Sequence, residues 1–426
     1  MNRRVVVTGM GGVTALGNDW QSIRPHLEAG RTAIRRMPDW DRYDGLNTRL
    51  GAPIVDRATA DRYPRKKTRT MGAVALMAVQ ATERALADAG LLGEPLLQSG
   101  AVGVAYGSSF GTPTAVQGFA ELQSQGSSRS LTATSYIQMM SHTAPVNIGL
   151  FFGLTGRVIT TSSACTSGSQ GIGYAYETIR SGKADVMIAG GAEEFDVTMA
   201  AVFDTLFATS TRNDRPETSP RPFDRDRDGL VIGEGAGTLI LEEREHALAR
   251  GSRIHCEIVG FATNSDGSHV TQPRMETMAT AMSMALADAG LSADAIGFVN
   301  GHGTATEWGD IAETQATQAV FGSGKPIHSL KGYFGHSLGA CGAIEAWLGI
   351  EMMRDGRFVA NANLDVVDER CAPLDYIMGG SRAIEIDYLT SNNFAFGGIN
   401  TSLIFRACDI ARWFRPVPFL SRLKSL

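Results

Sequence analysis

One cysteine, Cys165, stands in a setting that suits a nucleophile. It lies in the run Thr161-Ser-Ser-Ala-Cys-Thr-Ser-Gly168, where an expected strand turns into an expected helix. Unpaired backbone N–H groups and the macrodipole at a helix N-terminus favour a thiolate, and the small neighbouring residues leave room for a substrate. A free cysteine is more often a buried structural residue, so Cys165 alone leaves both interpretations open.

Two later histidines have glycine-rich surroundings. His302 stands in Gly301-His-Gly-Thr-Ala-Thr306, directly after an expected buried strand, and His336 ends Lys331-Gly-Tyr-Phe-Gly-His336 at an expected helix start. Neighbouring glycines let a ligand approach the backbone closely. A single histidine is more often structural than catalytic, but two in equivalent loops, together with Cys165, favour nucleophilic catalysis. No closely spaced group of His, Cys and Asp residues favours a metal site, and we expect none.

An internal repeat indicates how these loops come together. The run Ala81-Thr-Glu-Arg-Ala-Leu-Ala-Asp-Ala-Gly-Leu91 returns as Ala281-Met-Ser-Met-Ala-Leu-Ala-Asp-Ala-Gly-Leu291. Each copy predicts a helix that ends at a glycine suited to a left-handed cap. A short apolar strand and a glycine-rich loop follow, and the strands begin at Val102 and Ile296. The shared order of helix, strand and loop favours a duplication.

A second correspondence links the catalytic candidates. Cys165-Thr-Ser-Gly-Ser-Gln-Gly171 opens one expected helix and His336-Ser-Leu-Gly-Ala-Cys-Gly342 opens another, each with an apolar face. Strands follow such helices directly, as in βαβ units with buried parallel strands. We therefore expect an α/β protein with two pseudo-repeated halves whose loops meet at one site. The halves would span residues 1–250 and 251–410, followed by a tail of residues 411–426.

Composition limits the class of protein. The chain has 426 residues, 43% hydrophobic and 19% charged, which fits a globular protein with a large core. A net charge of -5 argues against nucleic acid as a partner. The apolar run Val5-Val-Val meets several glycines, so it predicts a strand running into a glycine turn rather than a signal peptide. The five scattered cysteines form no disulfide framework, and we expect a cytoplasmic location.

Taken together, these motifs resemble those of the β-ketoacyl-[acyl-carrier-protein] synthases, specifically the elongating Cys-His-His type. The resemblance extends from Val5 to Phe405 and is strongest in these runs: Ser163-Ala-Cys-Thr-Ser-Gly168, Arg221-Pro-Phe-Asp224 with Asp228-Gly229, His302-Gly-Thr304, Gly335-His336 and Asn393-Phe-Ala-Phe-Gly-Gly398. It implies a thiolase-like αβαβα layered fold built from two related halves. It also implies decarboxylative condensation of a malonyl group with a cysteine-bound acyl chain.

The resemblance assigns the chemistry to particular residues. Cys165 would accept the acyl chain, and His302 and His336 would act on the malonyl thioester. Lys331 would support that site, with Glu345 as its partner. Loss of CO₂ creates a carbon nucleophile without a strong base, and neutral histidines can donate to the oxygen where enolate charge develops. The enzyme would need no cofactor of its own, because its substrates are carried on the phosphopantetheine of acyl carrier protein.

Further residues are implied around this centre. Backbone N–H groups of Cys165 and Phe396 would form an oxyanion hole, and the Phe396 ring would act as a gate. Thr304 and Thr306 would bind the pantetheine arm. Phe110, in a glycine-rich loop, would shape the acyl pocket, with ordinary core packing as the alternative.

A basic segment is a candidate docking surface. Its basic residues are Arg62, Arg65, Lys66, Lys67 and Arg69. They form either a solvated surface or a dock for the acidic acyl carrier protein, and the resemblance adds Arg212. We expect a homodimer, with a heterodimer that includes a chain-length-factor-like subunit as the alternative. The basic and aromatic tail 411–426 is a candidate for membrane-surface or partner contact.

Several positions depart from the usual family pattern. Glu307 and Trp308 stand where smaller residues or proline are common, and Phe334 and Ile399 replace threonines. None of these changes removes a catalytic group. They leave open the acyl chain and the pathway, which is either primary fatty-acid synthesis or a specialised polyketide pathway such as aryl polyene synthesis.

Three other functions fit the sequence less well than a condensing enzyme does. A noncatalytic chain-length-factor-like partner lacks the nucleophile, so the presence of Cys165 argues against it. A thiolase-type acyltransferase requires a second cysteine in the C-terminal glycine loop, and residues 393–398 contain none. A cysteine hydrolase needs an activated water, and no residue in the sequence specifically supplies one.

Overall fold

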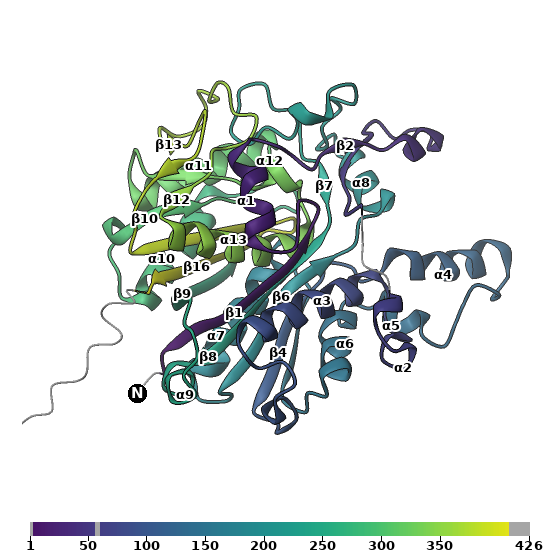
Figure 1. The fold of residues 1–426 in the computed structure, drawn as a ribbon. Coiled ribbons are helices and arrows are strands. Elements are labelled where there is room, and N and C mark those ends of the chain that lie inside the picture. Colours follow the sequence, from purple (N-terminus) through teal and green to yellow (C-terminus); the bar gives the residue numbers. More distant parts are fainter. Residues whose placement is uncertain (1–2, 56–59, 409–426) are drawn as a thin grey trace, which may run out of the picture.

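Two sets of strands with the same internal order make up the main sheet of the protein. The computed structural model describes residues 3–55 and 60–408 (Figure 1). The first set contains β1 (Val5–Thr14), β4 (Val102–Gly107), β5 (Val158–Thr161), β6 (Val186–Glu193) and β8 (Gly235–Glu243). The second contains β9 (Cys256–Ser265), β10 (Ile296–Asn300), β11 (Pro326–His328), β15 (Tyr388–Ala395) and β16 (Ile399–Ala407), with β13 (Asp375–Tyr376) added at the edge.

The strand order demonstrates the duplication. The first set runs β1-β8-β6-β4-β5 and the second runs β9-β16-β15-β10-β11, so each set places its strands in the chain order first, fifth, fourth, second, third. In both sets the first and fifth strands pair antiparallel and the second and third pair parallel. β1 and β9 join the sets through a short antiparallel pairing of 5–7 with 256–258. The predicted pair of pseudo-repeated halves is confirmed.

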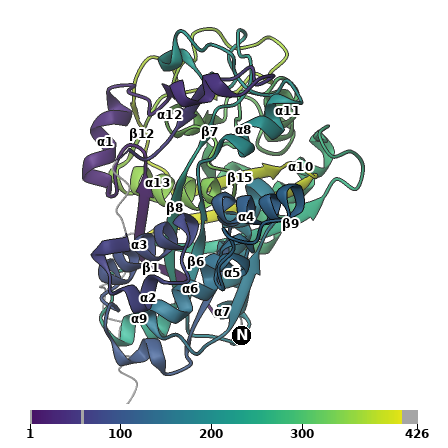
Figure 2. The ribbon, with the colours of Figure 1, turned by 90° about the vertical axis from the view of Figure 1, so that its right-hand side faces the viewer.

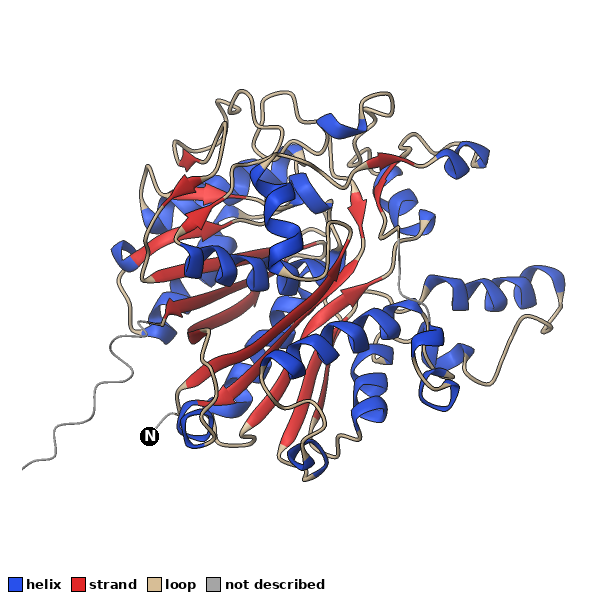
Figure 3. Ribbon diagram, viewed as in Figure 1, coloured by secondary structure: helices blue, strands red, loops and turns tan. Residues whose placement is uncertain are grey.

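Helices on both sides of each set of strands complete a layered fold. The middle layer contains α7 (Ser167–Arg180) and α13 (Cys341–Asp355), which contact strands of both sets. On the outer faces lie α3 (Ala73–Asp88) and α6 (Thr143–Phe152) for the first set, and α10 (Met275–Ala289) and α11 (Glu307–Phe321) for the second. Figure 3 shows the strands between these helices. This is the expected αβαβα arrangement.

Smaller elements surround this core (Figure 2). The helices are α1 (Trp20–Glu28), α2 (Arg65–Thr68), α4 (Pro113–Gln125), α5 (Ser135–Met139), α8 (Val197–Asp204), α9 (Arg244–Ala249) and α12 (Lys331–Phe334). The short strands are β2 (Arg35–Arg36), β3 (Leu50–Ala52), β7 (Ile232–Gly233), β12 (Arg357–Phe358) and β14 (Arg382–Ala383). Helix α4 projects from the body at the right of Figure 1. No helix in the described ranges is long and apolar enough to cross a membrane.

The glycines of β1 lie inside the strand, so the expected turn at this position is wrong. A Cβ on Gly9 would lie 2.2 Å from the carbonyl oxygen of Ala85 in α3, and one on Gly12 would lie 2.0 Å from the ring of Trp347 in α13. Helices therefore approach β1 closely from both faces. These glycines allow close packing rather than a change of chain direction.

An aspartate near the end of the repeated helix motif fixes each outer helix to its strands. In the first half, Oδ2 of Asp88 accepts a hydrogen bond of 2.9 Å from the backbone N–H of Met10 in β1. In the second half, Oδ2 of Asp288 accepts one of 3.1 Å from the backbone N–H of Phe261 in β9. The repeat noticed in the sequence thus has the same structural role in both halves.

Candidate active site

Cys165 lies in a strained turn between β5 and α7. A short 3₁₀ turn, Ala164–Thr166, precedes the first residue of α7, and Ala164 has a φ of 49°, which lies in the left-handed region. Such backbone strain persists where the surrounding structure demands it, and it is common at functional sites. The Cys165 side chain is buried, and its Sγ lies 2.9 Å from Nε2 of His336.

The second half repeats this turn without a nucleophile. A 3₁₀ turn, Leu338–Ala340, precedes α13, and Leu338 also has a positive φ, of 43°. Counted from the starts of the two helices, Gly339 corresponds to Cys165, and His336 lies three residues earlier. The alignment of Cys165 with His336 that the sequence favoured is therefore wrong by three positions, because both matched runs are rich in small residues.

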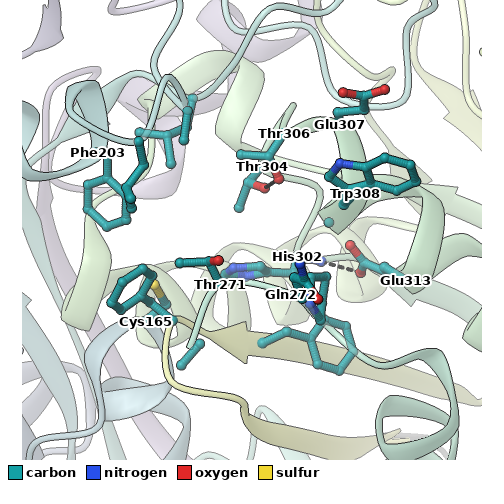
Figure 4. A pocket seen from close by; sticks show the side chains of 18 of the residues that line it. Cys165, Phe203, Thr271, Gln272, His302, Thr304, Thr306, Glu307, Trp308 and Glu313 are labelled. Atoms are coloured by element: carbon teal, nitrogen blue, oxygen red, sulfur yellow. Dashed lines mark hydrogen bonds between the residues drawn. The ribbon is translucent and has the colours of Figure 1, made fainter. Parts of the chain in front are cut away.

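The fold brings both histidines to the cysteine. His302 follows the end of β10, and its ring centroid lies 5.2 Å from that of His336 at a near-perpendicular angle. Together with Cys165 they form the base of a cavity of about 530 Å³. Phe203 and Phe207 contribute to its wall, as do Thr304, Thr306 and Trp308 (Figure 4).

A buried lysine orients His302. Nζ of Lys331 donates to Nδ1 of His302 over 3.1 Å and to Oε1 of Glu345 over 2.5 Å. The amide of Asn393 also lies against Nδ1, at 3.3 Å, and donates to Oε2 of Glu345 at 2.7 Å. An ammonium group has no acceptor, so Nδ1 accepts and the hydrogen of a neutral His302 ring is on Nε2.

Burial and positive charge keep both histidines neutral. Burial lowers the pKa of His302 well below its usual value, and the Lys331 ammonium and His336 lower it further. Burial and Lys331 likewise hold the pKa of His336 well below its usual value. For Lys331, burial opposes the charge, but the nearby Glu345 carboxylate raises the pKa and keeps the ammonium charged. The site thus presents two neutral imidazoles.

Burial opposes the ionisation of Cys165. Burial raises its pKa to about 11, although hydrogen bonds from the backbone N–H groups of Phe396 and of Cys165 itself, and the Lys331 charge, all act to lower it. Burial of the side chain thus opposes the thiolate that the start of α7 favours. The two backbone N–H groups nevertheless donate to the sulfur.

Two carboxylates in α11 hold the His302 loop, and sequence reasoning gave them no role. Glu313 accepts hydrogen bonds from the backbone N–H groups of His302 and Gly303, at 2.5 and 2.6 Å. Asp310 accepts one from Ala305. Burial raises the pKa of Glu313 to about 8 and that of Asp310 to about 6. The sequence offered one indication of this role: two carboxylates, three residues apart, follow the glycine-rich loop that contains His302.

Known proteins resemble this chain in both fold and sequence. Residues 2–247 match the family model described as beta-ketoacyl synthase, N-terminal domain, and residues 255–365 match the model of its C-terminal domain. The chain belongs to the beta-ketoacyl synthase family. Since the family and the fold agree, the protein is a condensing enzyme of the acyltransferase class.

Individual relatives match over most of this synthase. It is 37% identical over 418 residues to 3-oxoacyl-[acyl-carrier-protein] synthase 2 of Vibrio cholerae, covering 95% of this chain and 99% of that one. A crystal structure of a beta-ketoacyl synthase from Burkholderia phymatum superimposes with a TM-score of 0.94 at 59% identity, covering 95% and 100%. A type II polyketide ketosynthase solved with its acyl-carrier protein, AntDE:AntF, gives a TM-score of 0.85 at 29% identity, covering 96% and 100%.

Most of the other residues that the sequence analysis assigned to the site lie around the cavity. The hydroxyls of Thr304 and Thr306 lie 2.8 Å apart in its wall. The Phe396 ring is 37% exposed and packs edge-on against Phe203 at 5.9 Å between centroids. Phe110 is 40% exposed, which argues against ordinary core packing, and it is not among the residues that line this cavity.

The basic residues predicted to form a docking surface differ in their exposure and in their contacts. Arg62, Arg65, Lys66, Lys67 and Arg69 are all exposed. Lys67, however, donates to the carbonyl oxygen of Phe151 at 3.0 Å and lies 4.6 Å from the centre of its ring, so it has a packing role. Arg212 is less exposed and pairs with Asp228 at 3.4 Å. The tail 411–426 lies outside the described residues.

Two groups of side chains have ligand atoms near enough to share a metal ion. They are Cys165 with His302 and His336, and His302 with Cys341 and Glu345, each within 4.8 Å. The fold assembles them from distant segments, which explains why the spacing in the sequence gave no indication. The Lys331 ammonium, bound to both His302 and Glu345, repels a cation at either place.

Proposed function

We propose that this synthase carries its acyl chain on Cys165 and extends it with a malonyl group delivered by acyl carrier protein. The chain first moves from its carrier thioester to Sγ of Cys165, and the carrier thiol takes the sulfur's proton. The bond to the malonyl carboxylate then breaks and CO₂ leaves with its electrons remaining as an enolate. The enolate carbon attacks the acyl carbonyl, a C–C bond forms, and Cys165 leaves as thiolate. The observation that carries this proposal is the buried contact of Cys165 with His336 beside His302.

The histidines act in the malonyl step. The Nε2–H of His302, oriented by Lys331 from the far side of the ring, donates to the malonyl thioester oxygen as enolate charge develops. His336 donates to the same oxygen when the acyl group occupies the sulfur. Glu345 is the partner that keeps Lys331 charged and in place. Neutral imidazoles are suited to this task, since both rings remain donors throughout.

Backbone groups act in the acyl-transfer steps. The N–H groups of Cys165 and Phe396 form the oxyanion hole, which is supported by their hydrogen bonds to the sulfur. The Phe396 ring, partly exposed at the cavity, gates access to Cys165. Thr304 and Thr306 bind the pantetheine arm in the cavity wall, and Phe110 shapes the acyl pocket.

The carrier and a second subunit complete the enzyme. Arg62, Arg65, Lys66, Lys67, Arg69 and Arg212 form the dock for the acidic carrier. A homodimer covers the edge of the sheet, where β5 has no partner on its outer side among the described strands and leaves Val158 51% exposed. A chain-length-factor-like subunit in that place is the alternative. The enzyme acts in the cytoplasm without a cofactor of its own.

The pathway and the domain division belong to the same proposal. The synthase serves fatty-acid or polyketide synthesis, for which relatives of both kinds give support. The chain divides into residues 1–250, which carry Cys165, and 251–410, which carry both histidines.

Intact-mass analysis tests this function directly. After incubation with acyl-carrier protein, the parent enzyme should gain one acyl group and the variant Cys165→Ala should gain none. The alanine fills most of the same volume, so the melting temperature should stay close to that of the parent. An acyl adduct on Cys165→Ala would overturn the assignment of the nucleophile. Mass spectrometry of products formed with a panel of acyl-carrier proteins would then identify the pathway.

A further inference from the structure

A tryptophan at the cavity is left without a packing role. Trp308 is 65% exposed, whereas Trp20, Trp40 and Trp347 are at most 9% exposed. Tryptophan offers a large apolar surface, and burying such a surface is favourable. Trp308 also stands at a position where the family pattern has smaller residues. An exposed indole at this place, lining the cavity, suggests a ligand rather than a core contact.

The indole adjoins the two threonines of the cavity wall. Trp308 is the second residue of α11, and it precedes Gly309. A Cβ on Gly309 would lie 2.4 Å from Oγ1 of Thr306 and 3.3 Å from Oγ1 of Thr304, so both hydroxyls adjoin this helix start. Figure 4 shows Trp308 beside both threonines, with Cys165 on the other side of the view.

The backbone beneath the ring is firmly held. Arg227 donates to the carbonyl oxygens of Thr306 and Glu307, at 3.2 and 2.8 Å. The Glu307 carboxylate accepts from Arg370 at 2.6 Å. Arg227 is itself nearly inaccessible and pairs with Asp368 at 2.6 Å. These hydrogen bonds hold the backbone next to Trp308 in place. Binding a ligand at the indole would therefore require little reordering of the chain.

We propose that Trp308 binds the dimethyl-bearing segment of the phosphopantetheine arm. This inference rests on the proposed function, which brings the arm into the cavity. From the thioester outward, the arm carries two amides, then a hydroxylated segment with a carbon bearing two methyl groups, then the phosphate. The amides suit the hydroxyls of Thr304 and Thr306. The dimethyl carbon is the branched apolar part of the arm, and an indole beside the threonines gives it an apolar surface.

The nature of the ring, rather than the charge around it, favours the dimethyl segment over the phosphate. The carboxylates beside Trp308 are paired, Glu307 with Arg370 at 2.6 Å and Asp310 with Arg227 at 3.7 Å. The indole offers a large apolar face, so a neutral, methyl-rich segment gains more from burial against it than a strongly hydrated phosphate does.

Three thioesters that share one acyl chain test the inference. They are the carrier-bound acyl group, the acyl pantetheine thioester, and the acyl N-acetylcysteamine thioester, which lacks the dimethyl segment. In Trp308→Ala we expect the ratio of the KM for the pantetheine thioester to that for N-acetylcysteamine to rise about tenfold. The carrier-bound substrate should show the same rise. Trp308→Phe should restore most of the affinity, because it keeps an aromatic face.

Each other outcome overturns the inference. A rise confined to the carrier-bound substrate would show that Trp308 contacts the carrier protein instead. An equal rise for all three thioesters, or none, would show that it does not bind the arm. Tyr136→Ala is the matched control, since Tyr136 is 62% exposed and does not line the cavity. It should leave the ratio unchanged.

Fluorescence gives a second measurement without turnover. Titration with free pantetheine should shift and quench the emission of the parent enzyme, because Trp308 is the exposed tryptophan of the described residues. The same titration of Trp308→Ala should give no change, and a response retained in that variant would overturn the inference. Acylation of Cys165 at saturating substrate, followed by intact mass, keeps the two hypotheses apart. If the parent enzyme were not acylated, the proposed function would be refuted. If it were acylated but Trp308→Ala left the KM ratio unchanged, only the role of Trp308 would be refuted.

Discussion

Nζ of Lys331 lies 3.1 Å from Nδ1 of His302, and both groups are buried. Through this contact Lys331 affects both the orientation of His302 and the charge near it. It occupies the acceptor nitrogen of the imidazole, so that Nε2–H is left for a substrate oxygen, and it places a positive charge near a site where enolate charge develops. Glu345 balances that charge within 2.5 Å. Catalytic orientation and the stability of the buried pair therefore depend on the same lysine.

The first prediction concerns this shared dependence. Lys331→Met should slow CO₂ release from malonyl-carrier protein by about 10²–10³-fold, because the His302 donor loses its orientation and the enolate its nearby charge. The variant should also lose about 3–5 kcal/mol of unfolding free energy, since the Glu345 carboxylate stays buried without its partner. Denaturant unfolding and CO₂ release measure the two effects separately.

A double variant separates the two effects of Lys331. In Lys331→Met with Glu345→Gln, no buried charge is left alone, so much of the lost stability should return. CO₂ release should remain slow. If the double variant recovered both properties, Lys331 would act through stability alone and its role at His302 would be refuted.

The second prediction separates acyl transfer from decarboxylation. His302→Ala and His336→Ala should each still form the acyl adduct on Cys165, because two backbone N–H groups support charge at the sulfur without a histidine. Each should release CO₂ from malonyl-carrier protein poorly, by about 10²–10³-fold. Intact mass follows the first reaction and CO₂ release the second. Normal CO₂ release by either variant would contradict the malonyl role of that histidine.

The third prediction concerns pH. Because the pKa of Cys165 is raised to about 11, the thiolate is the minor form at neutral pH and its fraction rises with pH throughout the accessible range. Alkylation of Cys165 by iodoacetamide should accelerate about tenfold for each pH unit between pH 7 and 9, as thiolate-dependent reactions do. The Cys165→Ala variant gives the background from other cysteines. A rate that levels off near pH 7 would instead show a stabilised thiolate.

Sequence reasoning reached the fold because the duplication left a visible repeat. Asp88 and Asp288 were matched by their neighbours alone, and they make the same bond in both halves. The glycines of β1 were misread as a turn, because local propensity carries no information about the helix surfaces that pack against a strand. The burial of Cys165 was hidden for a similar reason: the sequence shows the helix start, while the depth of burial depends on distant segments.

The site was predictable where chemistry and spacing acted together. Residue type and glycine-rich surroundings indicate Cys165, His302 and His336, whereas the role of Lys331 follows from the family resemblance. Glu313 was not predicted, although its two hydrogen bonds hold the His302 loop. A carboxylate inside a helix looks like an ordinary surface residue, and only the fold shows that this one is buried. The polar residues that position a catalytic group are therefore harder to find than the group itself.

The fourth prediction concerns carrier docking. Arg65→Glu with Lys66→Glu should raise the KM for carrier-bound substrate about tenfold and change the KM for an acyl pantetheine thioester little, because reversal of exposed charge affects an acidic partner and not a small neutral substrate. The effect should shrink as salt is added, since screening weakens exposed pairs. Lys67 is left intact because it packs on Phe151. Equal effects on both substrates would refute the docking role.

The last prediction concerns Phe110 and the length of the acyl chain. Phe110 is 40% exposed, in the loop after β4. The preceding residue, Ser109, donates its backbone N–H to the buried Glu193, which also accepts from Gly339 at the turn before α13. The loop is thus tied to the active-site layer while the Phe110 ring remains available. If the ring limits the acyl pocket, Phe110→Ala should accept longer chains, with a gain of about fourfold for each additional buried CH₂.

Acylation rates across a series of saturated chains, and across rigid polyenoyl and aryl thioesters, measure this effect. The melting temperature should change little, because a ring that is 40% exposed contributes less to the core than a buried one. Sedimentation of parent and variant is the control, since a change in association could also alter the pocket. An unchanged chain-length profile in a variant of unchanged assembly would refute the pocket role and assign chain selection to other residues.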